Sequence, residues 1–415
     1  MVNLGLDRFM TDTSTAKISR FIPFRKTDVL EMCLHSSSLA EQEVPFRRFY
    51  HQLDRLLHYE FLSIIETLKD QYAPVDPDTD TRSSGLKPSA TTEPFADTLA
   101  QLIEQSNYNR ISQQEINQAF EQSSLFNIRL HVDFDDFSEV LLFSRGESVR
   151  HESVPRLLGF FPKDVEFVNY DRVVVYIKLR DDYQLVAGES SQCRPGSTLL
   201  KLFQDVPRGD LEMLFPNTAV RMRTLDKLLI GIPAVVSGGI VLTTKLGASL
   251  ALFGSLVGFW VGLSSEPVEL TKATAIALLA GFGTLGAYFW KQFSSFKNRK
   301  LGFMQALTQN LYFKSLDNNA GVIHRLGSDA QDEECKEALL AYYFLLTSGP
   351  MTSQQLDQTI ENWFDQQWDC QLDFEIGDAL AKIKRLNLIK DDKGLLSAVA
   401  LPKATAILDQ IWDIA

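Results

Sequence analysis

The sequence predicts an α+β integral membrane protein with an N-terminal α+β soluble domain, a central transmembrane helical hairpin and a C-terminal winged-helix-like domain. Three observations predict this fold class. A glycine-rich apolar block occupies residues 228–290, apolar spacing changes from helical to alternating within 1–220, and three helical patterns precede a hairpin pattern within 301–415. These observations place the predicted boundaries at 1–220, 221–300 and 301–415.

The chain is acidic overall and its cysteines are sparse. Asp and Glu number 53 against 41 Lys and Arg, which gives a formal net charge of −12 over 415 residues. Nucleic-acid binding rests on clustered positive charge, so this balance argues against nucleic acid as the main partner. The four cysteines are far apart, and no phosphate-loop, dinucleotide or metalloprotease motif is present. The sequence therefore predicts no cofactor and identifies no catalytic residue.

Residues 1–220 predict helices followed by a small antiparallel sheet. Apolar residues recur at helical spacing in 46–71, and Ser112 with Glu115 forms a capping box before a further helix. The period then changes to two, as in half-buried strands. We expect helices at 28–39, 46–71, 95–106 and from Ser112, a flexible loop at 74–94, and strands at 126–132, 140–143 and 173–179.

An acidic cluster lies between two of these strands and consists of Asp133, Asp135, Asp136 and Glu139. Paired carboxylates can bind a divalent cation or perform acid–base chemistry, so these four are candidate metal ligands. The alternative is an acidic turn that joins two strands, because Asp is a common turn residue. The sequence favours the turn.

The apolar block predicts membrane crossings. Residues 228–263 contain one charge, Lys245, and residues 273–290 contain none. About 20 apolar residues cross a bilayer, and basic residues flank both ends of the block, which favours two crossings over three. Small residues at i, i+4 and i+8 allow close helix packing in a membrane. The residues with that spacing in the first stretch are Gly254, Gly258 and Gly262.

The segments that flank the block combine apolar and basic side chains. Residues 201–220 are predicted either as core and linker or as a collar on the bilayer surface. In the second case, basic side chains would contact lipid head groups. The candidates are Arg208, Arg221, Arg223, Lys291 and Lys297.

The C-terminal part predicts three helices, a hairpin and a last helix, which is the plan of a winged helix. The expected ranges are 333–346, a helix from Ser353, 376–386, a hairpin at 388–401 and a helix at 404–412. The third helix carries Lys382, Lys384 and Arg385, which suggests DNA binding. However, residues 301–415 hold nine Lys and Arg against 17 Asp and Glu, a net charge of −8 that repels DNA. We therefore expect this module to bind protein.

Several short motifs occur together in this chain. They are Arg20-Phe21-Ile22-Pro23-Phe24-Arg25-Lys26, His58-Tyr59-Glu60, Tyr72-Ala73-Pro74, Asp76-Pro77-Asp78, Val132-Asp133-Phe134-Asp135-Asp136-Phe137, Asp210-Leu211-Glu212-Met213-Leu214 and Leu316-Asp317-Asn318-Asn319-Ala320-Gly321-Val322. From Arg20 to Leu388, the chain resembles the family of unknown function that includes transmembrane protein 143. The resemblance implies a membrane anchor near the middle and no established activity. Since the N-terminus is not Arg-rich like a transit peptide, a bacterial or cyanobacterial member is favoured.

The functional expectation is a membrane-anchored scaffold or adaptor that recruits protein partners. The alternatives are a membrane-bound metal-dependent enzyme that uses the acidic cluster, and a small lipid-handling or channel protein. The expected partners are membrane lipids, an unidentified protein and, through the glycine stripe, a second copy. The expected location is a bacterial inner or thylakoid-type membrane, or a mitochondrial membrane in a eukaryote, with the soluble domains on the cytoplasmic side.

Overall fold

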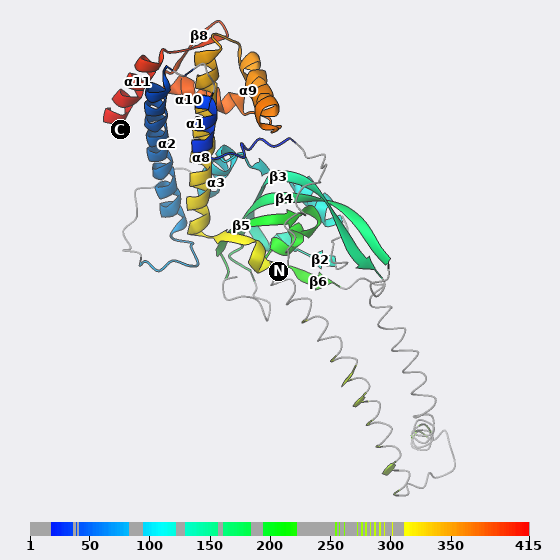
Figure 1. Ribbon diagram of the computed structural model, residues 1–415. Coiled ribbons are helices and arrows are strands. Elements are labelled where there is room, and N and C mark those ends of the chain that lie inside the picture. The colour runs from blue at the N-terminus through cyan, green and yellow to red at the C-terminus, as the bar shows by residue number, and fades with distance from the viewer. Residues whose placement is uncertain are drawn as a thin grey trace, which may run out of the picture. The chain divides into compact units, whose positions relative to one another are not determined.

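The structure of the chain is a computed structural model (Figure 1). It describes residues 18–35, 39, 41–82, 94–121, 129–156, 161–183, 194–221 and 311–414, and scattered positions between 254 and 301. The chain forms two compact units. The first consists of residues 1–125, 132–217 and 314–415, and the second of residues 126–131 and 218–313.

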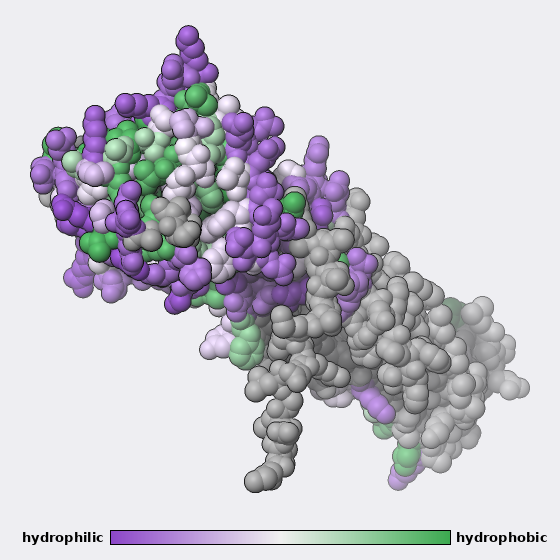
Figure 2. Space-filling model, turned by 45° about the horizontal axis from the view of Figure 1, so that its top comes forward, coloured by the Kyte–Doolittle hydropathy of each residue, from purple (hydrophilic) through white to green (hydrophobic). Residues whose placement is uncertain are grey.

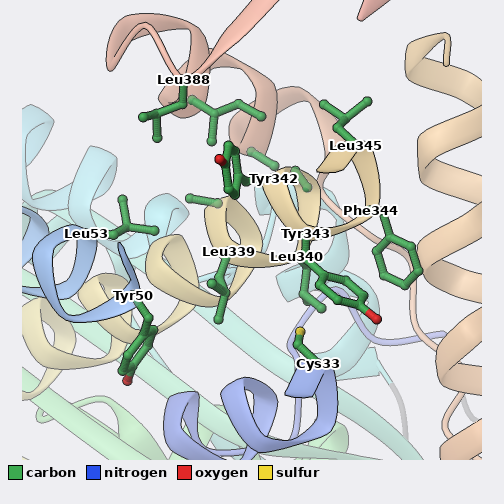
Figure 3. Close-up of a cluster of buried hydrophobic side chains, with 14 of the residues drawn as sticks. Cys33, Tyr50, Leu53, Leu339, Leu340, Tyr342, Tyr343, Phe344, Leu345 and Leu388 are labelled. Carbon is green, nitrogen blue, oxygen red and sulfur yellow. The ribbon is translucent and has the colours of Figure 1, made fainter. Parts of the chain in front are cut away.

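Long helices form the centre of the first unit. α1 (Lys26–His35) and α2 (Glu43–Tyr72) pack against α8 (Ala320–Thr347), and α2 lies alongside α8 (Figure 1). Their shared core includes large buried side chains from all three helices, several of which appear in Figure 3: Cys33, Tyr50, Leu53, Leu339, Leu340 and Tyr342. The prediction of helices near 28–39 and 46–71 is confirmed. The core joins parts of the chain that are almost 300 positions apart in sequence.

The C-terminal elements follow the predicted order. After α8 come α9 (Ser353–Trp368), α10 (Ile376–Arg385), β8 (Ile389–Asp392), β9 (Leu395–Ala398) and α11 (Leu401–Ile414). A Thr352–Gln355 capping box starts α9. The β8–β9 turn places Lys393 and Gly394 at positive φ, as a two-residue hairpin requires. These features confirm the three helices, the hairpin and the last helix.

An antiparallel sheet completes the first unit, with strand order β1-β3-β4-β5-β7. Its strands are β1 (Asn109–Arg110), β3 (Phe137–Arg156), β4 (Phe161–Leu179), β5 (Thr198–Pro207) and β7 (Ser315–Asn318). A second apolar core joins this sheet to α2, α8 and α3 (Phe95–Gln105), and includes Phe61, Leu102, Phe143, Val174, Leu200 and Leu326. The predicted strands at 140–143 and 173–179 are confirmed within longer strands.

Shorter elements complete the chain. α4 (Gln113–Glu121) follows the predicted capping box, in which the Ser112 N–H donates to Glu115 Oε2 at 2.8 Å. Two 3₁₀ segments, η2 (Phe134–Asp136) and η3 (Arg208–Leu214), flank the sheet and have three and seven residues. β2 (Arg129–His131) pairs with β6 (Ala219–Arg221) within the second unit. The strand predicted at 126–132 is therefore a short one in a separate two-stranded sheet.

The predicted integral membrane fold class is corrected by the structure. In the part of the chain that it describes, no helix is both long and apolar enough to cross a membrane. α2 and α8 have the length, with 30 and 28 residues, but both carry charged side chains along their course. This finding overturns the predicted transmembrane hairpin and the membrane location inferred from it.

Several predictions fall on residues outside the described ranges. Most of 222–310, including nearly all of the predicted crossings at 246–263 and 273–290, is not described, and neither are residues 83–93 of the predicted loop. The division into 1–220, 221–300 and 301–415 stays a prediction.

Candidate functional site: the polar core of α8 and the acidic face of α9

A run of charged residues lies inside the protein on α8. Glu333, Glu334, Lys336 and Glu337 are all buried, and Glu333 is only 1% exposed. A desolvated charge is costly unless another charge or a hydrogen bond compensates it. Each of these side chains is accordingly held by a partner.

The Glu333–Lys336 ion pair holds residues 19–24, here called the N-terminal segment, an irregular stretch whose chain bends at Arg20, Phe21 and Phe24. Glu333 and Lys336 are one helical turn apart and contact each other directly. Glu333 Oε2 accepts the N–H of Ile22 at 3.2 Å. Lys336 Nζ donates to the carbonyl oxygens of Ile22 at 2.8 Å and Phe24 at 3.2 Å. The buried pair therefore binds main-chain atoms.

Two further hydrogen bonds hold main-chain atoms of the N-terminal segment. The side chain of Asn107, at the end of α3, donates to the carbonyl of Arg20 at 3.1 Å. The N–H of Asp373 donates to the carbonyl of Ser19 at 3.0 Å, next to a parallel bridge between Ser19 and Leu372. The N-terminal segment thus lies across groups from three separate stretches of chain.

Side chains of the N-terminal segment add apolar and cation–π contacts. Ile22 is 1% exposed within the helical core. The Phe24 ring stacks on Phe364 with centroids 5.9 Å apart, and the Arg145 guanidinium lies 4.1 Å from the centre of the Phe21 ring. These contacts therefore involve the first motif of the family resemblance, residues 20–26.

Glu337 lies behind this segment and is paired with a neutral group. Its Oε1 accepts from Asn107 Nδ2 at 2.8 Å. Burial raises the pKa of Glu337 well above the ordinary 4.5, and the neighbouring Glu333 and Glu334 charges raise it further. Glu337 is thus the member of the α8 run that favours the protonated form.

The basic residues of α10 are all engaged within the protein. Lys382 Nζ lies 2.7 Å from Glu334 Oε2 of α8, and Lys384 Nζ lies 2.7 Å from an Asp391 carboxylate oxygen. Arg385 forms a two-pronged pair with Glu60 of α2. In a winged helix that binds DNA, the third helix offers such cations to phosphates. Here internal carboxylates neutralise them.

Among the described residues, the acidic side chains of α9 have no cation partner, and they range from half-buried Asp357 and Glu361 to exposed Asp365 and Asp369. Asp357, Glu361 and Asp365 recur at i, i+4 and i+8, and Asp369 caps the helix end, so they share one side. No Lys or Arg occurs between Lys336 and Lys382 in the sequence. Within the described residues, none of these four carboxylates forms an ion pair. We call these four residues the acidic face of α9.

Like charges on this face affect one another. The pKa of Asp357 is raised to about 6 by partial burial and by the nearby charges of Glu361 and Asp373. Glu361 accepts the N–H of Phe374 at 3.1 Å, and Asp365 accepts from the Gln371 amide at 3.1 Å. The face is thus held in place by neutral donors. Figure 2 shows hydrophilic residues over much of the helical part of the molecule.

The predicted acidic cluster is spread over separate structural roles. Asp133 caps η2 by accepting the N–H of Asp135 at 3.1 Å, and Asp136 accepts from the Asn217 amide at 2.8 Å. Glu139 lies on β3 and contacts Lys178 at 3.4 Å. Among the described residues, no group of His, Cys, Asp and Glu is arranged to hold a metal ion. The geometry is that of the acidic turn.

The predicted packing and lipid-contact residues fall mostly outside the described part. Gly258, Gly262, Arg223 and Lys297 lie outside it, as does the side chain of Arg221. Gly254 is described, with open space where a side chain would lie, and Lys291 is exposed.

Arg208 and residues 201–217 favour the core interpretation of the predicted collar. Arg208 is half-buried, with its Nε enclosed in the protein. Leu211, Leu214 and Phe215 are at most 5% exposed. This stretch is therefore part of the core.

A junction at Asn319 brings together three motifs of the resemblance. Asn319 Oδ1 accepts from the Tyr72 hydroxyl at 2.9 Å, and its amide nitrogen contacts Asp78. The Asn319 N–H donates to Leu200 O at 2.7 Å. Asn319 adopts φ 50°, a conformation rare for residues other than glycine. The junction ties β5, β7 and the end of α2 together where α8 begins.

A polar cavity of about 440 Å³ lies beside the N-terminal segment. It is lined by Arg20, Gln101, Glu104, Gln105, Tyr108, Asn109, Arg110 and Asp378. These walls carry both signs of charge and therefore select no single class of ligand.

Comparison with known proteins gives one family match. Residues 170–321 match the model of a family described as a protein of unknown function, DUF3754. The DUF3754 match runs from within β4 to the start of α8, so it includes the Asn319 junction but neither the α8 charged run nor α9. It confirms a likeness to a family of unknown function over these residues. No solved structure matches the chain.

The sequence did not reveal the main polar site. A run of charged residues on a helix usually marks a solvated face, and residues 332–337 have that composition. One signal was available, because the same helix continues into an almost wholly apolar stretch at 338–346. A helix that is apolar all round is buried, which suggests burial for its preceding turn as well.

Proposed function

We propose that this chain is a scaffold that binds a protein partner with a basic surface, and that the acidic face of α9 is the contact. The observation that carries the proposal is the contrast between neighbouring helices. The cations of α10 are paired with carboxylates of the same chain, whereas the carboxylates of α9 have no cation partner among the described residues. Complementary charge steers partners together and selects among them. We further propose that the whole chain belongs to the family that includes transmembrane protein 143.

Protein, rather than nucleic acid, suits this surface. A nucleic acid would bring more negative charge to a region with a net charge of −8. It would also have to displace Glu60, Glu334 and Asp391 from the α10 cations. A basic protein surface needs neither step.

The test compares three forms of the full chain in cells that express it. The first is wild type, the second carries Asp357→Asn, Glu361→Gln and Asp365→Asn, and the third is a control. The control removes the same charge from α2 and α3 through Asp70→Asn, Asp97→Asn and Glu104→Gln, all exposed positions. Each form is crosslinked in place, purified through a tag and analysed by mass spectrometry.

We expect a protein partner in fixed ratio with wild type and with the control, and about a tenfold loss with the α9 variant, which corresponds to roughly 1.4 kcal/mol of binding free energy. Crosslinks should connect α9 to basic residues of the partner. A partner that the α9 variant retains in full would refute the assigned surface. The absence of any stoichiometric partner would refute the scaffold function.

A further inference from the structure

The N-terminal segment occupies a groove whose polar groups are built to hold main-chain atoms. Four carbonyl groups and one N–H of residues 19–24 are held by Asn107, Glu333, Lys336 and the Asp373 N–H. Recognition through the main chain tolerates many sequences, and side-chain contacts then supply the preference. The groove therefore has the chemistry of a site for a peptide segment.

The polar groups of the groove are held by one another as well as by the occupant. Glu333 and Lys336 are fixed on α8, and Asn107 is held by Glu337. These side chains are at most 3% exposed. If the groove emptied, a desolvated ion pair would lose its main-chain partners, which is strongly unfavourable. If another peptide segment replaces the N-terminal segment, its main-chain atoms can keep the hydrogen bonds to Glu333, Lys336 and Asn107.

We propose that the N-terminal segment is an intramolecular occupant of a peptide-binding groove, and that a peptide segment of the partner protein takes its place. The inference rests on the proposed scaffold function and specifies the partner. The peptide carries the order basic, aromatic, aliphatic, proline, aromatic, as in residues 20–24.

Each position of this order has a counterpart in the groove. The basic residue meets Glu375, as Arg20 does. The first aromatic ring lies under Arg145, and the aliphatic side chain enters the core. The second aromatic ring stacks on Phe364 at the α9 wall. Pro23 is exposed and donates no hydrogen bond, so proline is accepted there.

The charge around the groove matches the same partner. The N-terminal end of the segment lies beside Asp373 and Glu375. Its aromatic residue Phe24 contacts α9 through Phe364 and Trp368. The groove and the acidic face of α9 are therefore adjacent. A basic partner that docks on α9 brings its own chain to the groove.

The experiment loosens the chain's own segment and supplies a peptide. The full chain carries Phe24→Ala, which removes the ring contact on Phe364 but no main-chain bond, and circular dichroism verifies its fold. The probe is a fluorescent peptide with the sequence of residues 18–27, and its anisotropy reports binding. The matched variant is Arg25→Gln, because the Arg25 side chain is 83% exposed and, among the described residues, forms its ion pair with Asp28. A peptide of the same composition in scrambled order tests specificity.

We expect the Phe24→Ala chain to bind the peptide about tenfold more tightly than wild type or Arg25→Gln, because its own segment competes less. The scrambled peptide should not bind. Equal binding by all three chains, or none, overturns the proposal. A Phe24→Ala chain that forms a dimer through exchanged segments also overturns it, in favour of a second copy as occupant.

Hydrogen exchange of wild type supplies a readout if Phe24→Ala fails to fold. Exchange of the Ile22 amide before the α8 amides near Tyr342 supports an opening that leaves the groove intact. Exchange of both only on global unfolding overturns the proposal. Peptide binding without a cellular partner would instead count against the scaffold function alone and leave the groove standing.

Discussion

α8 and α9 are consecutive helices with similar acidic runs, and the structure treats them in opposite ways. The run at 332–337 of α8 is largely buried, and its charges are bound by Asn107, Lys382 and the N-terminal segment. The acidic face of α9 has no cation partner within the described residues. The position of a helix in the fold, rather than its own composition, therefore decides whether its charges stabilise the core or offer a surface.

The contrast follows from partners that are remote in sequence. The partners of the α8 charges come from residues 19–24, Asn107 and α10, so they exist only after the chain has folded. α9 packs through Leu356, Ile360 and Phe364 and leaves its carboxylates outside the core. Three predictions test this comparison, beginning with the largest effect.

The largest effect is expected from breaking the buried pair on α8. Lys336→Ala leaves the Glu333 carboxylate buried without its cation and frees the carbonyls of Ile22 and Phe24. Removing one partner of a buried pair costs roughly 3–5 kcal/mol. Urea unfolding should show a loss of that size in the free energy of unfolding.

The matched control is Lys384→Ala, which breaks an exposed pair with Asp391. Exposed pairs contribute roughly 0–1 kcal/mol. Equal losses for the two lysine variants would show that the α8 run is not a buried network.

A second, smaller effect distinguishes the members of the α8 run by pH. Folding raises the pKa of Glu337. At pH values between the pKa of the unfolded chain and that of the folded protein, the folded protein therefore binds more protons at Glu337 than the unfolded chain does. Stability from this group is therefore present at low pH and falls as pH rises through that window. Glu337→Gln removes the titration, and its amide oxygen still accepts from Asn107.

We expect Glu337→Gln to change the free energy of unfolding by less than about 1 kcal/mol at about pH 5 and to stabilise the protein relative to wild type at about pH 8. Urea titrations at the two pH values measure both quantities. Glu333→Gln is the comparison, since it breaks the ion pair with Lys336 and should destabilise at both. A Glu337→Gln variant that loses more stability at high pH than at low pH would contradict the assignment.

The C-terminal helices and hairpin were predictable because helical spacing and turn residues are visible in short stretches of sequence. Leu356, Ile360 and Phe364 lie on one face at helical spacing, and Gly394 meets the backbone requirement of the β8–β9 turn. By contrast, the prediction began the preceding helix at Glu333, whereas α8 begins at Ala320. The charged run interrupts the apolar pattern, and only packing on α2 and the sheet shows that both halves are one helix.

The other features that the sequence analysis missed also depend on contacts between residues that are remote in sequence. The sheet takes β7 from beyond residue 314, so its last strand pairs across more than 100 positions that local spacing cannot connect. β5 was interpreted only as core or collar because its buried and half-buried residues do not alternate strictly. The apolar block was assigned to membrane crossings from its length, its apolar composition and its basic flanks, whereas no helix in the described part of the chain is long and apolar enough to cross a membrane. The Glu333–Lys336 site was missed because sequence does not show which charges will be desolvated.

The smallest effect concerns the acidic face of α9. The pKa of Asp357 is raised to about 6 in the folded state, against an ordinary value of 3.8. Its contribution to stability is therefore lost as pH rises through that interval, and at neutral pH the charge opposes folding. Asp357→Asn should stabilise the protein at about pH 7 by no more than roughly 1 kcal/mol, because the side chain is only partly buried and its repulsions are screened.

At about pH 4 the difference between Asp357→Asn and wild type should nearly vanish, since both side chains are then close to neutral. Thermal unfolding at the two pH values measures this, with Asp365→Asn as an exposed substitution of the same charge on the same face. Added salt should shrink the gain at pH 7, because screening weakens the repulsion from Glu361 and Asp373. A loss of stability in Asp357→Asn at pH 7 would mean that its carboxylate is compensated like those of α8, and the two helices would no longer differ in kind.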